Sequence, residues 1–277
     1  MKRLRTTAPS PLAAAAALAL LCGCASVSPQ QEVEIGQQEV QKINAQLPLL
    51  NDAQITGYVT QLGTSIARTT SRADLDWHFY VVNTDVINAF AVPGGFIYVN
   101  RGVLDRASNM SELAGVLGHE IEHIVRRHSV KQMEQVQGAN VGVALACALT
   151  GVCENQAAQA AVQVGGAAVF AKFSRQDEIE ADDGGFNNLV RSGIDPTGML
   201  TFFQKLLAEQ QRGDPKGVSA WFADHPGTQD RIADIQRMLS QLPEDKRSQL
   251  RRDDPAFQSM KQHLAQLPPA PPPPQSQ

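Results

Sequence analysis

The chain has 277 residues, which is long enough for one substantial domain with its own hydrophobic core. It carries 28 acidic and 24 basic side chains, a net charge of −4. This balance argues against nucleic acid as a partner, because proteins that bind phosphate backbones need clustered positive charge. It argues equally against attachment to a membrane through a basic patch.

The first 23 residues predict a lipoprotein signal peptide. Three basic residues among the first five precede a short apolar run at 11–22, which is too short to span a bilayer. The run ends in Leu-Cys-Gly-Cys, which resembles the bacterial lipobox, and this resemblance implies that Cys24 becomes the lipidated first residue. Ala25 and Ser26 resemble the pattern of lipoproteins sent to the outer membrane. We therefore expect a protein anchored by lipid in the outer membrane and facing the periplasm; an ordinary signal peptide cleaved elsewhere is the alternative.

Two helical patterns follow, at 29–47 and 52–69, and then a strand-like alternation at 77–82. The region 88–99 is rich in strand-forming residues and is interrupted by a Pro-Gly-Gly sequence, which predicts a hairpin. An exposed edge strand here could pair with an extended peptide, so the substrate-binding candidates are Asn88, Ala89 and Phe90. The alternative is an ordinary hairpin of the core.

The next element, a helix expected over 110–133, contains the sequence His119-Glu120-Ile121-Glu122-His123. Two histidines four residues apart share a helix face and can bind one Zn²⁺ through their imidazole rings. Glu120 between them reaches the metal-bound water and can act as general base for peptide hydrolysis. Apolar residues at helical spacing place this motif at the edge of a buried core; they are Leu113, Val116, Leu117, Ile121 and Ile124.

Residues 139–172 are rich in Ala, Gly, Val and Gln and predict a helical hairpin that packs over the catalytic core. Its most apolar stretch is shorter than a membrane span and is followed by polar residues. Cys147 and Cys153 flank an expected turn at 150–151, and an oxidising periplasm would permit a disulfide between them.

A catalytic zinc ion needs a third protein ligand, and the segment after this hairpin offers Glu178. Asp182 follows one turn later on the same face and could hold a ligand histidine by its other ring nitrogen. Glu180 projects elsewhere and is expected to be exposed. His128 is the competing candidate; if the helix at 110–133 is continuous, His128 faces away from the motif and is not a ligand.

Two further helical patterns, at 197–211 and 230–242, are expected to cover the core. Between them, a proline follows His225, and a histidine in such a position is more often a loop residue than a catalytic one. The segment 266–277 is Pro-rich and should be extended and disordered. One domain is therefore expected over 24–265, and the sequence contains no internal repeats.

These motifs together resemble the zinc metallopeptidases of the HtpX and CAAX-prenyl-protease type, in their small bacterial lipoprotein branch. The resemblance covers roughly residues 33–242 and rests on the segments 31–36, 88–99, 112–120, 174–182, 225–226 and 231–232. It implies a single zinc ion bound by His119, His123 and Glu178. It also implies that Glu120 is the base and that Asp182 orients a ligand histidine.

Glu122 differs from the usual family pattern, and His225 belongs to a loop that the family shares. Glu122 stands where the family usually has a small residue, so it adds negative charge next to the site without removing a ligand. In relatives the His-Pro loop lies over the active site, which makes His225 a secondary site residue. It would act either as an inhibitory extra ligand or as a group that stabilises the oxyanion.

The expected fold is α+β, mainly helical, with a small antiparallel sheet. The expected function is that of a zinc endopeptidase which, as the resemblance suggests, cleaves misfolded or misassembled envelope proteins. The outer-membrane assembly machinery is a candidate partner. The alternative is a lipoprotein that chaperones outer-membrane components, with its peptidase centre silent or held shut by His225. A purely structural lipoprotein would have no use for the metal-binding residues.

Overall fold

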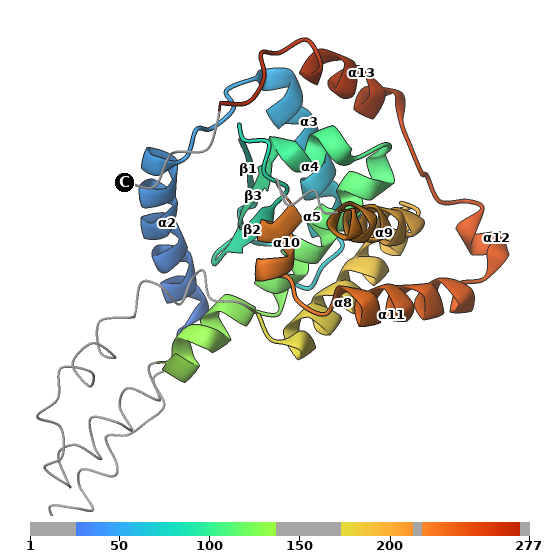
Figure 1. Cartoon of the computed structure of the whole chain (residues 1–277). Helices are drawn as coiled ribbons and strands as arrows, with labels where there is room; N and C mark the ends of the chain where they lie inside the picture. Colours follow the sequence, from blue (N-terminus) through green and yellow to red (C-terminus); the bar gives the residue numbers. More distant parts are fainter. Residues whose placement is uncertain (1–25, 137–172, 213–217, 272–277) are drawn as a thin grey trace, which may run out of the picture.

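The computed structural model of the chain describes residues 26–136, 173–212 and 218–271 (Figure 1). The expected signal peptide with Cys24, the hairpin at 139–172 and the pair Cys147 and Cys153 lie outside the described residues and stay predictions. The described residues form many helices and one small sheet, so the expected mainly helical α+β fold is confirmed.

Two helices begin the described chain, α2 (Pro29–Gln46) and α3 (Ala53–Ala67). A capping box starts α2, because the Ser28 side chain accepts from the backbone N–H of Gln31 while the Gln31 side chain accepts from that of Ser28. The Asp52 carboxylate caps α3 by accepting from two backbone N–H groups. These caps explain why both helices begin within one residue of the ranges predicted from sequence.

The sheet contains β1 (His78–Val82), β2 (Ala89–Val92) and β3 (Phe96–Asn100) in the order β1-β3-β2. β2 and β3 form the expected antiparallel hairpin, turned through Gly94 and Gly95 at φ 87° and 107°. β1 pairs with β3 in parallel, so the sheet is mixed and the prediction of an antiparallel sheet was wrong for this pair. β3 lies between β1 and β2, and all five of its residues are buried, as is typical of a strand covered on both faces.

After the short α4 (Arg101–Arg106), α5 (Met110–Val125) runs through the middle of the molecule (Figure 1). Fifteen of its sixteen residues are buried, which marks it as a core helix packed on several sides. The helix ends eight residues before the predicted end at 133. Arg127 adopts a left-handed conformation at φ 58°, which interrupts the helix, and a second helical segment starts at His128.

The remaining helices are α8 (Arg175–Arg191), α9 (Thr197–Gln211), α10 (Val218–Asp224), α11 (Thr228–Gln241), α12 (Glu244–Arg247) and α13 (Pro255–Leu264). Both α8 and α9 pack against α5, and α11 packs against both of them. Gly115 permits the close approach of α9, since a Cβ there would lie 2.8 Å from the Met199 Cα. Of the helices in the described part of the chain, none is both long and apolar enough to cross a membrane.

Candidate metal centre

The two histidines of the α5 motif meet the glutamate of α8 in the buried centre of the molecule. The Nε2 atoms of His119 and His123 lie 3.0 Å apart, as expected for one face of a helix. Glu178 places its two carboxylate oxygens 3.4 Å from Nε2 of His119 and 3.5 Å from Nε2 of His123. All three side chains are fully buried. The three ligands predicted from sequence are therefore brought together.

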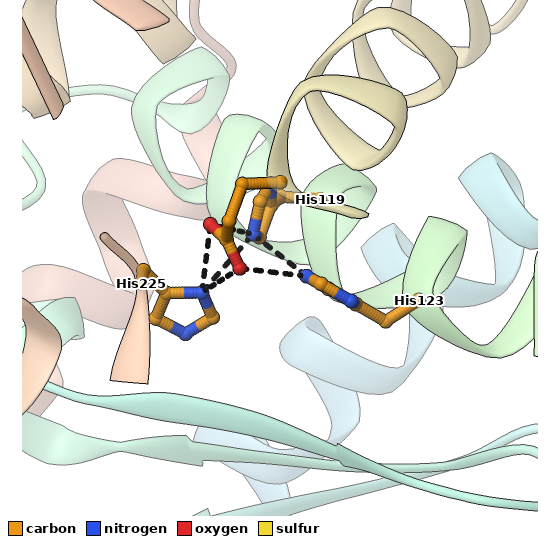
Figure 2. A group of neighbouring side chains, drawn as sticks. His119, His123 and His225 are labelled. Carbon is orange, nitrogen blue, oxygen red and sulfur yellow. Dashed lines mark hydrogen bonds and ion pairs between the residues drawn. The ribbon is translucent and has the colours of Figure 1, made fainter. Parts of the chain in front are cut away.

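His225, the residue directly after α10, also belongs to this cluster. Its Nδ1 lies 3.2 Å from the nearer Glu178 oxygen and 3.2 Å from Nε2 of His119. Its Nε2 lies 3.5 Å from Glu120 Oε1 and 3.5 Å from the Ala89 carbonyl oxygen. The ring packs against the ring of Trp221, with 4.5 Å between centroids. Figure 2 shows the three imidazole rings pointing toward a common centre.

The donor set fits a metal ion. One ligand atom from each of His119, His123, Glu178 and His225 lies within 4.8 Å of the others, and all four residues are buried. Imidazole nitrogens and a carboxylate oxygen are the ligands that zinc prefers in proteins. Both oxygens of Glu120 are buried beside them, and among the described contacts neither has a hydrogen-bond partner. A buried carboxylate of this kind is costly unless it faces a cation or a water molecule.

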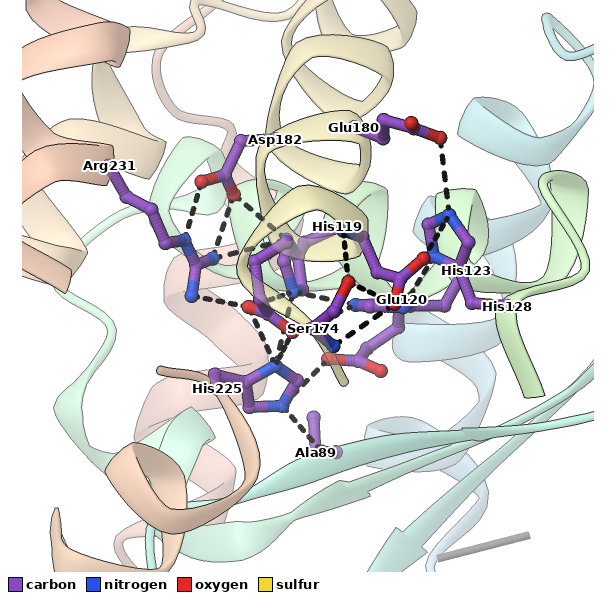
Figure 3. A network of polar contacts seen from close by, with 12 residues as sticks. Ala89, His119, Glu120, His123, His128, Ser174, Glu180, Asp182, His225 and Arg231 are labelled. Carbon is purple, nitrogen blue, oxygen red and sulfur yellow. Dashed lines mark hydrogen bonds and ion pairs between the residues drawn. The ribbon is translucent and has the colours of Figure 1, made fainter. Parts of the chain in front are cut away.

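Asp182 and Arg231 support the ligands from behind, as Figure 3 shows. Asp182 Oδ1 lies 2.9 Å from Nδ1 of His119, so a ring protonated at Nδ1 would keep the Nε2 lone pair free for a metal. The Arg231 guanidinium donates to both oxygens of Asp182, at 2.6 and 2.8 Å, and its Nη1 lies 2.5 Å from Glu178 Oε2. The position predicted for Asp182 thus agrees with the geometry.

The sequence predicted no function for Arg231, although the segment 231–232 was part of the family resemblance. A signal was present: Arg231 shares one face of α11 with Ile235 and Leu239, at intervals of four residues, and all three are buried. An arginine in line with two core residues predicts a buried guanidinium, which requires carboxylate partners.

Burial and neighbouring charges shift the pKa values of the clustered side chains in different directions. Burial opposes ionisation of Glu178, but His225, Arg231 and His119 outweigh it and hold its pKa well below the usual range. Burial and Arg231 also oppose protonation of His119, yet the carboxylates of Glu178 and Asp182 raise its pKa to about 9. Burial and the neighbouring His119 depress the pKa of His123 strongly, which favours a neutral ring. Burial raises the pKa of Glu120 above its usual range.

The expectation that His128 faces away from the motif was wrong. Its rejection as a ligand stays a prediction, and the grouped ligand atoms do not include it. Because α5 ends at Val125, the chain turns and brings Nδ1 of His128 to 2.9 Å from Nδ1 of His123. Glu180, expected to be exposed, is only 30% exposed and places an oxygen 3.6 Å from Nε2 of His128. The prediction from sequence assumed a continuous helix and therefore missed the contact between His128 and His123.

Glu122 points away from the ligands, into the contact between α5 and α8. Its carboxylate accepts from the Asn188 amide at 2.5 Å and from Arg126 Nε at 3.0 Å. A Cβ at Gly184 would lie 2.1 Å from its Oε2, so the glycine on α8 makes room for it. The expected extra charge next to the site is therefore neutralised within a helix-helix contact.

A cavity of about 290 Å³ opens beside the centre, along β2. Its lining includes the candidate substrate-binding residues Asn88, Ala89 and Phe90. β2 is one of the two outer strands of the sheet, and it lies next to the cluster, as expected for the edge strand. The opposite wall comes from α2 and from Phe173, and it is mainly apolar. Asn88 donates to Asp224 at 2.8 Å, which ties the strand to the end of α10.

Comparison with known proteins places this arrangement in a family. The sequence model of Peptidase family M48 matches residues 53–239. The chain is 33% identical over 225 residues to the Beta-barrel assembly-enhancing protease of Escherichia coli strain K12, which covers 79% of this chain and 46% of that protein. It is 35% identical over the same length to the protein of that name from Yersinia pestis, with the same coverage. It is also 32% identical over 154 residues to the Metalloprotease LoiP of E. coli strain K12, covering 56% of this chain and 59% of that protein.

The chain spans about half the length of the assembly-enhancing proteases that it matches. The narrower resemblance to the HtpX and CAAX-prenyl-protease type stays a prediction, whereas the broader peptidase family is confirmed. Because the matched range covers more than half of the sequence and contains the motif of α5, the carboxylate of α8 and the arginine of α11, the chain belongs to peptidase family M48.

Proposed function

We propose that this protein is a zinc-dependent endopeptidase of the small lipoprotein branch that resembles the HtpX and CAAX-prenyl-protease type. One observation carries the proposal: the buried convergence of His119, His123 and Glu178 around a position that Glu120 also faces. The names of the relatives, which are proteases and a metalloprotease, support it.

Each residue of the centre has a chemical task in this proposal. His119, His123 and Glu178 hold the zinc ion, which when bound acidifies water and polarises a carbonyl group. Glu120, whose pKa is raised by burial, accepts a proton from the attacking water and passes it to the leaving amine. Asp182, itself held by Arg231, keeps the Nε2 lone pair of His119 directed at the metal.

We further propose that an extended peptide lies along the outer edge of β2. Within the described residues no other strand pairs with that edge, and an edge strand of this kind can bind an extended peptide. A side chain of the peptide would then enter the neighbouring cavity. Ile43, Leu47 and Phe90 line that cavity, and their apolar surfaces favour an apolar side chain.

The proposed location is the outer membrane, with the protein anchored through Cys24 and facing the periplasm. This rests on the sequence pattern of the first 26 residues. The proposed substrates are misfolded or misassembled envelope proteins. The word assembly in the names of two relatives supports the outer-membrane assembly machinery as a partner.

A second candidate function is that of a lipoprotein chaperone whose peptidase centre is held shut. The observation that favours it is the position of His225, whose ring stands among the ligands at 3.2 Å from both Glu178 and His119. Such a protein would bind unfolded envelope proteins without cleaving them.

Substitution of the base separates the two functions. Glu120→Gln should abolish cleavage of casein or another unfolded protein, by more than the roughly 10²–10⁴-fold typical of a lost general base, since the water is also mispositioned. Zinc content, measured by mass spectrometry, should stay at one ion per chain because every ligand is kept. Glu122→Gln, the same change two residues along the same helix but outside the centre, should retain activity. Near-normal cleavage by Glu120→Gln would remove Glu120 from this role, and an inactive wild-type protein that binds substrate would favour the chaperone.

A further inference from the structure

We propose that His128 is a positioning residue for the metal ligand His123, accepting a hydrogen bond from the Nδ1–H of that ligand. The inference rests on the proposed metal site and adds a residue to it. His128 is fully buried, and its Nδ1 lies 2.9 Å from Nδ1 of His123 (Figure 3).

The direction of this hydrogen bond follows from the task of His123. Its Nε2 faces the cluster, 3.0 Å from His119 Nε2 and 3.5 Å from Glu178, so that nitrogen must offer a lone pair to the metal. A neutral imidazole carries one proton, which then sits on Nδ1. Nδ1 of His128 must therefore be the acceptor, and the proton of His128 sits on its own Nε2.

Two carboxylates stabilise that form of His128. Asp177 Oδ1 and Glu180 Oε2 each lie 3.6 Å from its Nε2, which is beyond hydrogen-bond range but close enough for electrostatic attraction to an N–H. Both acids belong to α8, the helix that also supplies Glu178. At His119, the Asp182 carboxylate contacts the Nδ1 of the ligand ring directly. At His123, the ring of His128 lies between the ligand ring and the carboxylates of Asp177 and Glu180.

The fold orients the His123 ring in two ways that complement each other. Phe173 stacks on it at 3.9 Å between centroids and 22° between planes, which restrains the tilt of the ring. His128 meets it edge-on at 75° and restrains rotation in the ring plane. The contact exists only because Arg127 takes a left-handed conformation and is held there by Glu32, 2.7 Å from its Nε.

Two substitutions of His128 test its two ring nitrogens separately: Nδ1, the proposed acceptor, and Nε2, which faces Asp177 and Glu180. His128→Asn keeps a polar oxygen near the position of Nδ1 and should keep the hydrogen bond. His128→Gln moves its polar group toward the position of Nε2 and loses the acceptor. Loss of a group that orients a ligand usually weakens metal binding about 10–100-fold. We expect that loss for His128→Gln and a loss of about threefold or less for His128→Asn.

The measurement is the dissociation constant for zinc, determined by competition with a chromophoric chelator, with the visible absorption spectrum of the cobalt-loaded protein as a second readout. His128→Gln should also change that spectrum, because the ligand ring can rotate. His78→Gln, at a histidine that is 41% exposed and outside the centre, should change neither quantity. If His128→Gln does not fold, His128→Ala provides a second variant without the acceptor.

Zinc affinity in both acceptor-free variants equal to wild type would overturn the proposal. Equal losses in His128→Asn and His128→Gln would also overturn it, because a packing role does not distinguish the two ring positions. A wild-type protein that binds no zinc would instead refute the metal site itself, so the two failures are distinguishable.

Discussion

Two buried glutamates of the centre show how neighbours decide chemistry at the scale of single residues. Glu120 and Glu178 are both excluded from water, which by itself raises a carboxyl pKa. For Glu120 this effect prevails, so the pKa is raised and the group can exchange protons. For Glu178 the positive fields of His225, Arg231 and His119 prevail, so it stays an anion suited to a cation. In the proposed function, one residue type therefore provides both the base and a metal ligand.

Glu178 and Asp182 are expected to differ in how strongly they affect zinc binding. Glu178→Ala removes a ligand and should lose zinc and peptidase activity together. Asp182→Asn removes only the charge behind His119 and should weaken zinc binding by about 10–100-fold. Metal analysis after dialysis against a chelator series measures both. Full zinc occupancy in Glu178→Ala would mean that another residue is the third ligand, with His225 first in line because its Nδ1 already lies in the cluster.

His225 has two candidate roles that predict opposite results. If its ring occupies the position that catalysis must keep open, His225→Ala should raise cleavage of unfolded protein. The ring stands 3.2 Å from two proposed ligands, so we favour this gating role. If it stabilises the oxyanion instead, the same change should lower turnover by roughly 10²–10³-fold. Initial cleavage rates of purified protein decide between them, and an unchanged rate would leave His225 with neither role.

At the scale of elements, one buried ionic contact joins four segments. The Glu32 carboxylate on α2 lies 2.8 Å from Arg72 Nη1 and 2.7 Å from Arg127 Nε, and it accepts from the backbone N–H of Gly94 at 3.3 Å. It thus connects α2 with the segment after α3, the end of α5 and the turn of the hairpin. The other end of α2, at Ile43 and Gln46, lines the cavity beside the centre, so the contact anchors a helix that borders the proposed substrate site.

Removing this carboxylate should cost far more than removing an exposed one. Glu32→Ala leaves two arginines without their partner and should lower the free energy of unfolding by about 3 kcal/mol, at the low end for a broken buried pair because Arg127 is 30% exposed. Glu39→Ala, on the same helix, breaks an ion pair with the largely exposed Lys42 and should cost less than about 1 kcal/mol. Urea unfolding followed by circular dichroism compares the two. Equal losses would show that the Glu32 contact adds no stability beyond a surface pair.

At the scale of the whole molecule, the centre is assembled from parts of the chain that are far apart in sequence. α5 supplies His119, Glu120 and His123, α8 supplies Glu178 and Asp182, and α11 supplies Arg231. A metal ion bound there would join α5 to α8, so binding and folding are thermodynamically coupled. The extensive contact between these two helices, with Gly118 against Gly185, holds the histidines of α5 and the carboxylates of α8 close together.

The sequence by itself determined the features that depend on local spacing. The four-residue interval places His119 and His123 on one face, and the helical patterns at 29–47 and 52–69 locate the first two described helices. The Pro-Gly-Gly sequence between strand-forming residues predicts the hairpin, because glycine alone takes these turn conformations readily. The third ligand could also be proposed, since a zinc site needs one more donor and Glu178 stands on a helix with Asp182.

Only the tertiary structure decided the rest, because it depends on contacts between distant segments. The parallel pairing of β1 with β3 joins strands that are not consecutive in the chain, and local patterns do not reveal it. The left-handed Arg127 is held by Glu32, 95 residues away in sequence, and no local signal marks the helix end that brings His128 to His123. Arg231 likewise has a role only because α11 packs beside α8, where its charge is balanced by Asp182 and Glu178. Burial creates the need for these partners, and burial is a property of the folded chain.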